Sequence, residues 1–274
     1  MTDLFALDGR VAIVTGGTGT LGSKMAGALA EAGAAVGILA RDQKRVEATV
    51  AEIAAAGGAA FPLPADVLDR RQLEQARDLA VSRDGHIDVL VNAAGGNLPE
   101  ATIDPDGTFF DLPPDALEAV FRLNVSGTML ACQVFGQALI PQPEDAGRSI
   151  VNISSMSAGR VLSRVVGYAA AKAAIENFTR WLAVDCARRH GDRLRVNAIA
   201  PGFLVSAQNQ ALILQADGQP TERGRAIIDH TPAGRLGEPA DLISTLLWLC
   251  SPASRYVTGV VVPVDGGFSA WSGI

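Results

Sequence analysis

The segment RVAIVTGGTGTLG, residues Arg10–Gly22, decides the predicted fold. Its first part, Arg10–Thr15, is a run of apolar and β-branched residues, which predicts a β-strand. The alanine-rich segment Leu21–Ala32 follows it and predicts a helix. The glycines between the two permit positive φ and a close approach of the backbone. A strand, a glycine-rich turn and a helix in this order predict the first unit of an α/β fold.

Six further apolar runs follow, separated by segments of helix length. They predict strands at Ala34–Ala40, Ala59–Ala65, Ile87–Asn92, Ser149–Ile153, Leu194–Ala200 and Val257–Val264. The run Ala59–Ala65 is the weaker one because it contains Pro62 and Pro64, and Asp42 is expected to cap the second helix. The pattern predicts a single α/β domain over residues 1–274. Its expected architecture is a Rossmann-type, doubly wound parallel sheet of about seven strands with helices on both faces.

The composition limits the class of protein. The chain has 274 residues, of which 48% are hydrophobic, and this suffices for one large core. Its formal charge of −6 argues against an electrostatic nucleic-acid partner. No apolar run approaches the roughly 18 residues of a membrane span, and the acidic start differs from a secretory signal. Cys132, Cys186 and Cys250 lack the spacing of a disulfide or metal framework, so a cytoplasmic chain with reduced thiols and no metal site is expected.

The glycine turn predicts a phosphate-binding site. Gly17, Gly19 and Gly22 fit the pattern GxGxxG, which indicates dinucleotide binding when it joins a first strand to a first helix. The diphosphate would lie on the free N–H groups at the helix N-terminus. Two alternatives are a tight turn without a ligand and a nucleoside-triphosphate loop. The latter is disfavoured because Lys24 stands one place too late for that motif and no Walker-type carboxylate is evident.

The residues after the second strand bear on the choice of coenzyme. A carboxylate there binds the ribose 2′-hydroxyl of NAD, whereas an arginine binds the 2′-phosphate of NADP. Arg41 therefore favours NADP(H) over NAD(H), its alternative role being that of a solvated arginine. Asp42 could serve NAD, but an aspartate directly before a helix is more typical of a cap. Asp66, after the third strand, is expected beside the adenine, with Val67 packed on it.

Three side chains in the middle of the chain suggest acid–base chemistry. Tyr168 and Lys172 are four residues apart in a strongly helical segment, so they project from one face of the helix. A phenol used as a base near pH 7 costs roughly 4 kcal/mol unless neighbouring positive charge stabilises its anion. Ser155, at the end of the fifth strand, could donate a hydrogen bond to a substrate oxygen. Each residue alone would be ordinary helix surface or a cap; together with the glycine turn they indicate an active site.

These motifs resemble the short-chain dehydrogenase/reductase family over the whole length of the chain. The resemblance rests on Thr15–Gly22, Asn92-Ala93-Ala94-Gly95, Asn124, Ser155, Tyr168, Lys172, Pro201-Gly202 with Ser206, and Asp265-Gly266-Gly267. One departure is Thr20, where single-domain members of the family have glycine. The resemblance implies an NAD(P)(H)-dependent oxidoreductase that transfers hydride between nicotinamide and a carbonyl or secondary alcohol.

The same resemblance implies residue roles. Tyr168 would be the general acid/base, and Ser155 would orient the carbonyl. Lys172 would hold the nicotinamide ribose and lower the phenol pKa, while Asn124 would position a water. The implied coenzyme-binding residues are Gly16, Thr18, Gly19, Thr20, Leu21, Gly22, Arg41, Asp66, Val67, Asn92, Ala93, Gly95, Tyr168, Lys172, Pro201, Gly202 and Val205.

A closer resemblance concerns the substrate. AAGGN, NISSM, NFTRWLAVD, the HTP motif at His230–Pro232 and the ending VPVDGGFSAWSGI are similar to the D-mannonate oxidoreductase (fructuronate reductase) branch, although Ala233 and Leu236 depart from it. This implies a keto sugar acid such as fructuronate or mannonate. The candidate substrate residues are Gly96, Asn97, Ser157, Gln208, Asn209 and His230, with Arg160 and Arg164 nearby. Substrate loops are expected near residues 95–114 and 201–230.

Other activities and partners follow from the same features. A 3-oxoacyl thioester reductase, or another sugar or alcohol dehydrogenase of the family, is the alternative enzyme. A dinucleotide-binding regulator is disfavoured because all four catalytic candidates are present, and a hydrolase because no GxSxG elbow occurs. The helices around Leu117–Ile140 and Tyr168–Arg189 are apolar on more than one face, so each needs a second packing partner. The family resemblance implies that this partner is another subunit of a homodimer or homotetramer; the alternative is a thicker core within one chain. The expected ligand is a small molecule; no nucleic acid, membrane or zinc is expected.

Overall fold

One parallel β-sheet organises the protein. The computed structural model describes residues 4–140, 147–206 and 209–273. The sheet has seven strands in the order β3-β2-β1-β4-β5-β6-β7, and every neighbouring pair is parallel. The strands are β1 (Val11–Thr15), β2 (Ala35–Ala40), β3 (Ala59–Pro64), β4 (Val89–Asn92), β5 (Arg148–Ile153), β6 (Leu194–Pro201) and β7 (Val261–Val264). The predicted α/β class and doubly wound parallel sheet are confirmed.

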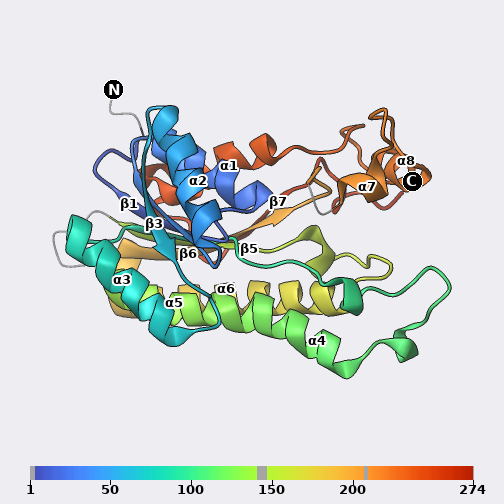
Figure 1. The fold of residues 1–274 in the computed structure, drawn as a ribbon, viewed down its shortest axis with the longest axis horizontal. Coiled ribbons are helices and arrows are strands. Elements are labelled where there is room, and N and C mark those ends of the chain that lie inside the picture. Colours follow the sequence, from blue (N-terminus) through green and yellow to red (C-terminus); the bar gives the residue numbers. More distant parts are fainter. Residues whose placement is uncertain (1–3, 141–146, 207–208, 274) are drawn as a thin grey trace.

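Helices cover both faces of the sheet (Figure 1). On one face lie α1 (Thr20–Glu31), α2 (Gln43–Ala55) and α9 (Ile243–Cys250); on the other lie α3 (Arg70–Asp84), α4 (Pro114–Phe121), α5 (Gly127–Ala138) and α6 (Val166–His190). Strand β1 shows why both faces need cover: Ala12 and Val14 belong to the core on the α1 side, whereas Val11 and Ile13 belong to the core on the α3 side. Two short helices, α7 (Gln210–Ile213) and α8 (Glu222–Asp229), lie beyond the sheet.

Several boundaries differ from the predicted ones. The helix expected around Leu117–Ile140 is split into α4 and α5 by a π-helix, Arg122–Ser126, which apolar periodicity does not reveal. Strand β7 begins at Val261 instead of Val257, because Val257 still closes a turn with Ser254. The proline-containing β3 is an edge strand, where a missing N–H donor is tolerated. The predicted loops contain short helices, among them Pro99–Ala101 and Phe109–Asp111.

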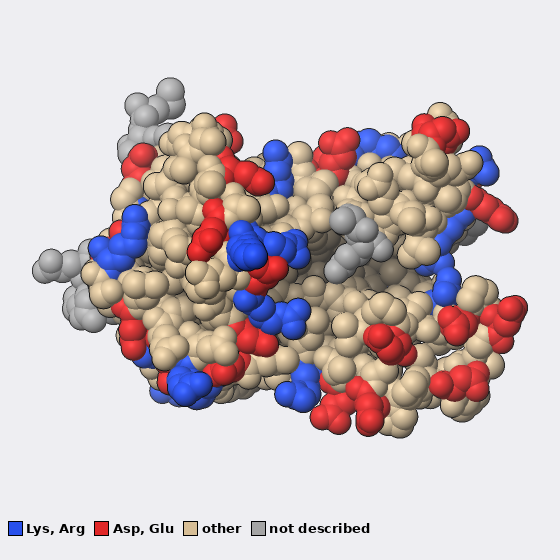
Figure 2. Space-filling model, in the orientation of Figure 1, with Lys and Arg blue, Asp and Glu red and all other residues tan. Residues whose placement is uncertain are grey.

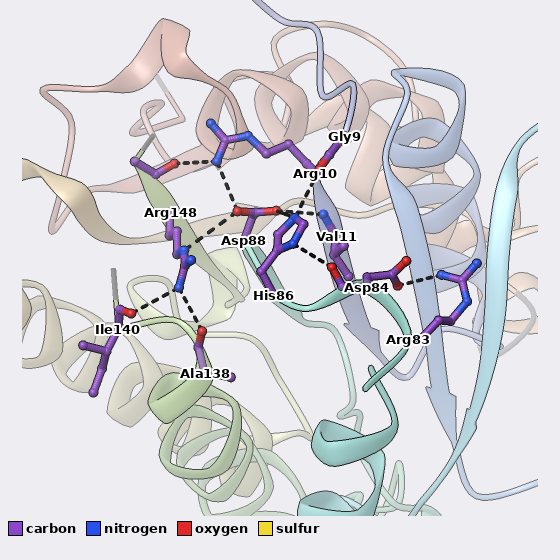
Figure 3. A network of polar contacts seen from close by, with 11 residues as sticks. Gly9, Arg10, Val11, Arg83, Asp84, His86, Asp88, Ala138, Ile140 and Arg148 are labelled. Atoms are coloured by element: carbon purple, nitrogen blue, oxygen red, sulfur yellow. Dashed lines mark hydrogen bonds and ion pairs between the residues drawn. The ribbon is translucent and has the colours of Figure 1, made fainter. Parts of the chain in front are cut away.

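A buried charge network closes the amino-terminal edge of the sheet (Figure 3). Asp88, only 5% exposed, accepts a hydrogen bond from the Val11 backbone N–H at 2.9 Å. Its carboxylate also lies 3.4 Å from a guanidinium nitrogen of Arg10, 3.8 Å from Nε of Arg148 and 3.1 Å from Nε2 of His86. Arg10, Asp88 and Arg148 lie at the starts of the adjacent strands β1, β4 and β5. The network therefore holds the amino-terminal ends of these three strands together.

Other sequence expectations can be compared with the described residues. Asp42 caps α2 as predicted, because its Oδ1 accepts from the Arg45 backbone N–H at 3.2 Å. Cys132, Cys186 and Cys250 are buried free thiols, and burial raises the pKa of Cys132 to about 12. Within residues 4–140, 147–206 and 209–273, no helix has both the length and the apolar character needed to cross a membrane.

Candidate active site

A cavity of about 530 Å³ opens at the carboxyl ends of the strands. The glycine turn after β1 forms one wall, and the segments after β4, β5 and β6 form the others. Figure 2 shows this region hollowed between the lobe that carries α7 and α8 and the lobe that leads into α4. The lining residues are Gly16, Gly19, Thr20, Leu21, Gly22, Arg45, Ala93, Gly95, Gly96, Ile153, Ser154, Ser155, Met156, Leu162, Tyr168, Lys172, Pro201, Gly202, Phe203, Leu204, Ser206 and Asn209.

The glycine turn has the shape that a dinucleotide needs. Gly16 has φ of 65°, and a Cβ there would lie 2.8 Å from the backbone of Ala94. A Cβ on Gly22 would lie 2.1 Å from the carbonyl oxygen of Gly16, so only glycine allows the turn to fold this tightly onto α1. Helix α1 begins after Gly19 without a side-chain cap or an acidic residue in its first turn. Its positive end is therefore available to the diphosphate of NAD(P), and these residues fit that group.

The arginine that lines the cavity near α2 is Arg45 and not the predicted Arg41. Arg41 is exposed and does not line the cavity. Arg45, which the sequence analysis did not select, lines it and donates from its guanidinium to the carbonyl oxygen of Thr18 at 2.8 Å. This contact places a cation directly over the glycine turn. The signal that could have found Arg45 is its place in the first turn of α2, four residues after Arg41 in the sequence.

Of the other coenzyme candidates after β3 and β6, Asp66, Val67 and Val205 lie outside the cavity lining. Val67 is 6% exposed and belongs to the core on the α3 side, where it contacts Gly127. The Asp66 carboxylate accepts from the backbone N–H of Leu68 at 2.9 Å and so stabilises a turn. Val205 is tied to Gly237 by its backbone N–H at 3.0 Å. Pro201 and Gly202 do line the cavity, and Gly202 is packed so closely on Asp265 that its Cβ would lie 2.6 Å from that residue's Cα.

Ser155, Tyr168 and Lys172 converge on the cavity. The Ser155 Oγ accepts from the backbone N–H of Ser157 at 3.2 Å and from its Oγ at 3.0 Å. With both acceptor positions used, the Ser155 proton remains for the oxygen of Tyr168, to which it is hydrogen-bonded, or for a ligand oxygen. Burial raises the pKa of the Tyr168 phenol, and the hydrogen bond with Ser155 opposes this rise.

Lys172 supplies positive charge beside the phenol. Its Nζ lies 5.5 Å from the centroid of the Tyr168 ring and donates to the carbonyl oxygen of Ile153 at 2.8 Å. The residue is 5% exposed, and burial lowers the pKa of Lys172 to about 8. At neutral pH the side chain is still mostly an ammonium ion, so it can favour the phenolate form of Tyr168.

The low pKa of Lys172 predicts how stability depends on pH. Below about pH 8 the buried ammonium costs stability. Between about pH 8 and the ordinary lysine pKa, Lys172 is protonated in the unfolded chain but neutral in the folded protein. The free energy of unfolding therefore rises with pH over this range. From pH 7 to 9.5, wild type should gain about 2 kcal/mol relative to Lys172→Met, measured by urea unfolding at both pH values. Parallel pH dependences of the two proteins would contradict the assignment.

Asn124 connects the π-helix to the loop after β4. Its Oδ1 accepts from the Gly96 backbone N–H at 3.1 Å, and its Nδ2 donates to the Gly96 carbonyl at 2.8 Å and to Val120 at 2.9 Å. Asn124 does not line the cavity but holds Gly96, which does. Asn92, 2% exposed, lies behind this loop, where its Nδ2 donates to Asn152 Oδ1 at 2.9 Å.

The substrate candidates are only partly brought together. Gly96 and Asn209 line the cavity, although the Asn209 side chain is used to hold its own loop through Leu204 and Ser206. Asn97 and Ser157 do not line the cavity, although each follows a residue that does, Gly96 and Met156. His230 is exposed and packs against Phe268 and Trp271, with ring centroids 6.0 and 5.5 Å apart. Gln208 lies outside the described residues, which contain no group of three potential metal ligands.

Comparisons with known proteins agree with this geometry. A family model described as enoyl-(acyl carrier protein) reductase matches residues 17–269. The Bacillus subtilis oxidoreductase UxuB, whose activity is uncharacterised, is 46% identical over 98% of each chain. A Haemophilus influenzae structure with bound NAD, provisionally described as a D-mannonate oxidoreductase, is 41% identical over 98% of each chain with a TM-score of 0.91.

A third relative broadens the range of coenzymes. A gluconate 5-dehydrogenase from Burkholderia cenocepacia, solved with NADP and tartrate, is 31% identical over 98% of each chain, with a TM-score of 0.85. NAD and NADP therefore both occur in structures similar to this chain. The sheet order, the glycine turn and these similarities lead to one conclusion: the chain belongs to the short-chain dehydrogenase/reductase family of NAD(P)-dependent oxidoreductases that act on CH–OH groups.

Proposed function

We propose that this enzyme interconverts a keto sugar acid and its hydroxy acid, of the fructuronate/mannonate type, with NADP(H) as the preferred coenzyme. The observation that carries the proposal is that Ser155, Tyr168 and Lys172 line one cavity. Structures similar to this chain include proteins described as sugar-acid enzymes. Asn97 follows the cavity-lining residue Gly96. Among the described residues its buried Oδ1 has no hydrogen-bond partner, which leaves an acceptor for a substrate hydroxyl next to the cavity.

The chain's own groups account for the acid–base half of the reaction. We assign Tyr168 as the group that gives a proton to the substrate oxygen during reduction and takes it during oxidation. Ser155 donates to the same oxygen, because Ser157 occupies its acceptor positions. Lys172 favours the anionic phenol by its charge, and Asn124 keeps Gly96 in place at the cavity wall. When bound, NAD(P) supplies or accepts the hydride.

Two arginines support the preference for NADP(H). Arg45 lies over the glycine turn, and Arg41 follows the strand whose end faces the adenosine ribose in this fold. Arg41→Ala and Arg45→Ala should each raise the KM for NADPH about tenfold or more, as expected for a lost charge-assisted hydrogen bond, and change the KM for NADH less than twofold. Lys44→Ala, which removes an exposed positive charge from the same helix end, is the control. Equal changes for both coenzymes would contradict the preference.

A panel of substrates tests the chemical class. D-mannonate, D-fructuronate, D-gluconate, a simple secondary alcohol and a 3-oxoacyl thioester are each assayed with NAD(H) and NADP(H), following absorbance of the reduced coenzyme. The proposal predicts the highest kcat/KM for a sugar acid with NADP(H). Highest activity with the thioester would favour the alternative activity, a 3-oxoacyl thioester reductase, and overturn the sugar-acid assignment.

We also propose that the chain forms a homodimer or homotetramer through α6. Trp181 and Val184 on this helix are 63% and 58% exposed, an unusual exposure for large apolar side chains. A second copy of the same helix would bury both. Sedimentation analysis should show a dimer or tetramer for wild type and a shift toward monomer for Trp181→Glu. A wild-type protein that sediments as a monomer would contradict the proposal.

A further inference from the structure

Two arginines on one connection hold two segments that pack against residues of the cavity lining. The connection runs from the end of β5 to the start of α6 and carries Ser155 at its beginning. Near its middle, Arg160 donates from Nε to the backbone carbonyl of Ser269 at 2.8 Å, and a second guanidinium nitrogen contacts the same oxygen. Near its end, Arg164 donates from Nε to the backbone carbonyl of Ile103 at 2.5 Å. Figure 2 shows basic side chains in the gap between the two lobes.

Arg164 is held in a conformation that its side chain disfavours. Its φ is 76°, and it is the only non-glycine residue with positive φ in the part of the chain that the structure describes. A residue with a Cβ pays free energy in this region, whereas glycine does not. The backbone carbonyl of Arg164 also accepts from the Ile103 N–H at 2.9 Å. Glycine could make that backbone contact equally well, so what arginine adds at this position is its side chain.

The loop held by Arg164 lies directly against the candidate active site. Ala101, two residues before Ile103, is fully buried in a small cluster that includes Tyr168 and Ala171 of α6. The same loop is stiffened by Asn97, whose Nδ2 donates to Thr102 Oγ1 at 2.7 Å. A change at the Arg164–Ile103 contact is therefore transmitted over a few residues to the packing around Tyr168.

The C-terminal segment held by Arg160 packs behind a residue that lines the cavity. Phe268 precedes Ser269 and packs edge-on against Phe203, a cavity-lining residue, with ring centroids 5.5 Å apart. Asp265 shapes this segment by accepting from the backbone N–H groups of Gly267 and Ser269, both at 2.9 Å. The segment therefore supports the position of Phe203 in the cavity lining.

We propose that Arg164 is a positioning residue that sets the substrate end of the cavity, and that Arg160 is its counterpart at the C-terminal segment. Arg164 holds the loop at Ile103 against Tyr168, and Arg160 holds the C-terminal segment against Phe203. Both act through backbone carbonyls and not by bonding to the reacting atoms. The inference rests on the proposed function for its kinetic consequence: loosening either contact weakens substrate binding and leaves the coenzyme end unchanged.

Arg164→Gly separates the two roles of this residue, because it keeps the backbone conformation and removes the guanidinium. Four quantities are compared with wild type: Tm, coenzyme Kd, the kinetic constants for the panel compound that wild type uses best, and hydrogen exchange of the peptide spanning residues 98–112. We expect a Tm no lower than that of wild type, a coenzyme Kd within twofold and a kcat within threefold. The KM should rise at least tenfold, and exchange in the peptide should be faster. Arg164→Lys, which can donate to Ile103, should restore part of the KM.

A failure of the positioning role can be distinguished from a failure of the proposed function. If the best compound is not a sugar acid, the substrate assignment fails, but the comparison of KM values still tests Arg164. If no compound is turned over, hydrogen exchange alone decides. An unchanged KM, unchanged exchange, or a KM rise matched by equal losses in coenzyme affinity and Tm would overturn the positioning role.

Discussion

Replacing Tyr168 by phenylalanine is expected to lower kcat by about 10³-fold, within the range that a positioned general acid contributes. The substitution removes only the hydroxyl that is hydrogen-bonded with Ser155 and leaves the ring beside the ammonium of Lys172. Coenzyme Kd should therefore change less than twofold, because the glycine turn and the start of α1 are untouched. Steady-state kinetics and a coenzyme titration measure the two quantities on the same preparation.

The chain offers a matched control for this experiment. Tyr256 is the only other tyrosine in the sequence and is 95% exposed. Tyr256→Phe removes the same hydroxyl from a position remote from the cavity lining and should leave kcat unchanged. Turnover by Tyr168→Phe within tenfold of wild type would show that the proton comes from another group and would refute the assigned mechanism.

Asp88→Ala is expected to lower the free energy of unfolding by about 3–5 kcal/mol, because it leaves buried cations without their counter-charge. Arg148 is 6% exposed and shares this carboxylate with Arg10, while the Val11 N–H loses its acceptor (Figure 3). Urea unfolding followed by circular dichroism measures the change. Coenzyme affinity of the folded protein should remain close to that of wild type, because Asp88 lies at the opposite edge of the sheet from the cavity.

Asp84→Ala is the control for this prediction. It breaks the ion pair with Arg83, whose side chain is 42% exposed, in the same region of the molecule. An exposed pair contributes at most about 1 kcal/mol. Equal losses of stability for Asp84→Ala and Asp88→Ala would show that the buried network has no special role in holding the three strands together.

Much of the fold follows from local patterns. Continuous apolar runs predicted the parallel sheet, because strands covered on both faces show no polar alternation. The weak strand containing Pro62 and Pro64 proved to be the edge strand β3, as the loss of N–H donors requires. Helix spacing placed Tyr168 and Lys172 on one face of α6, and both line the cavity. These predictions depend on residues that are close in sequence.

The remaining features depend on contacts between distant residues. Asp88 and Arg148 are 60 positions apart in the numbering and meet only because β4 and β5 are neighbours in the sheet. The π-helix around Asn124 has the sequence RLNVS, in which nothing marks a departure from an ordinary α-helix. Ser157, predicted at the substrate, donates a hydrogen bond from its Oγ to the Oγ of Ser155 at 3.0 Å. Each arrangement is set by tertiary packing, which helix and strand periodicity does not predict.

The proposed mechanism requires the coenzyme to meet Ser155, Tyr168 and Lys172 in one cavity in a reactive arrangement. A crystal structure of the enzyme with NADPH and a non-reactive sugar-acid analogue tests this arrangement most directly. The diphosphate should lie on the turn Gly16–Gly22, with the nicotinamide beside Gly202. An oxygen of the analogue should lie within hydrogen-bonding distance of both Ser155 and Tyr168. A diphosphate bound elsewhere, or an analogue oxygen out of reach of both hydroxyls, would contradict this mechanism.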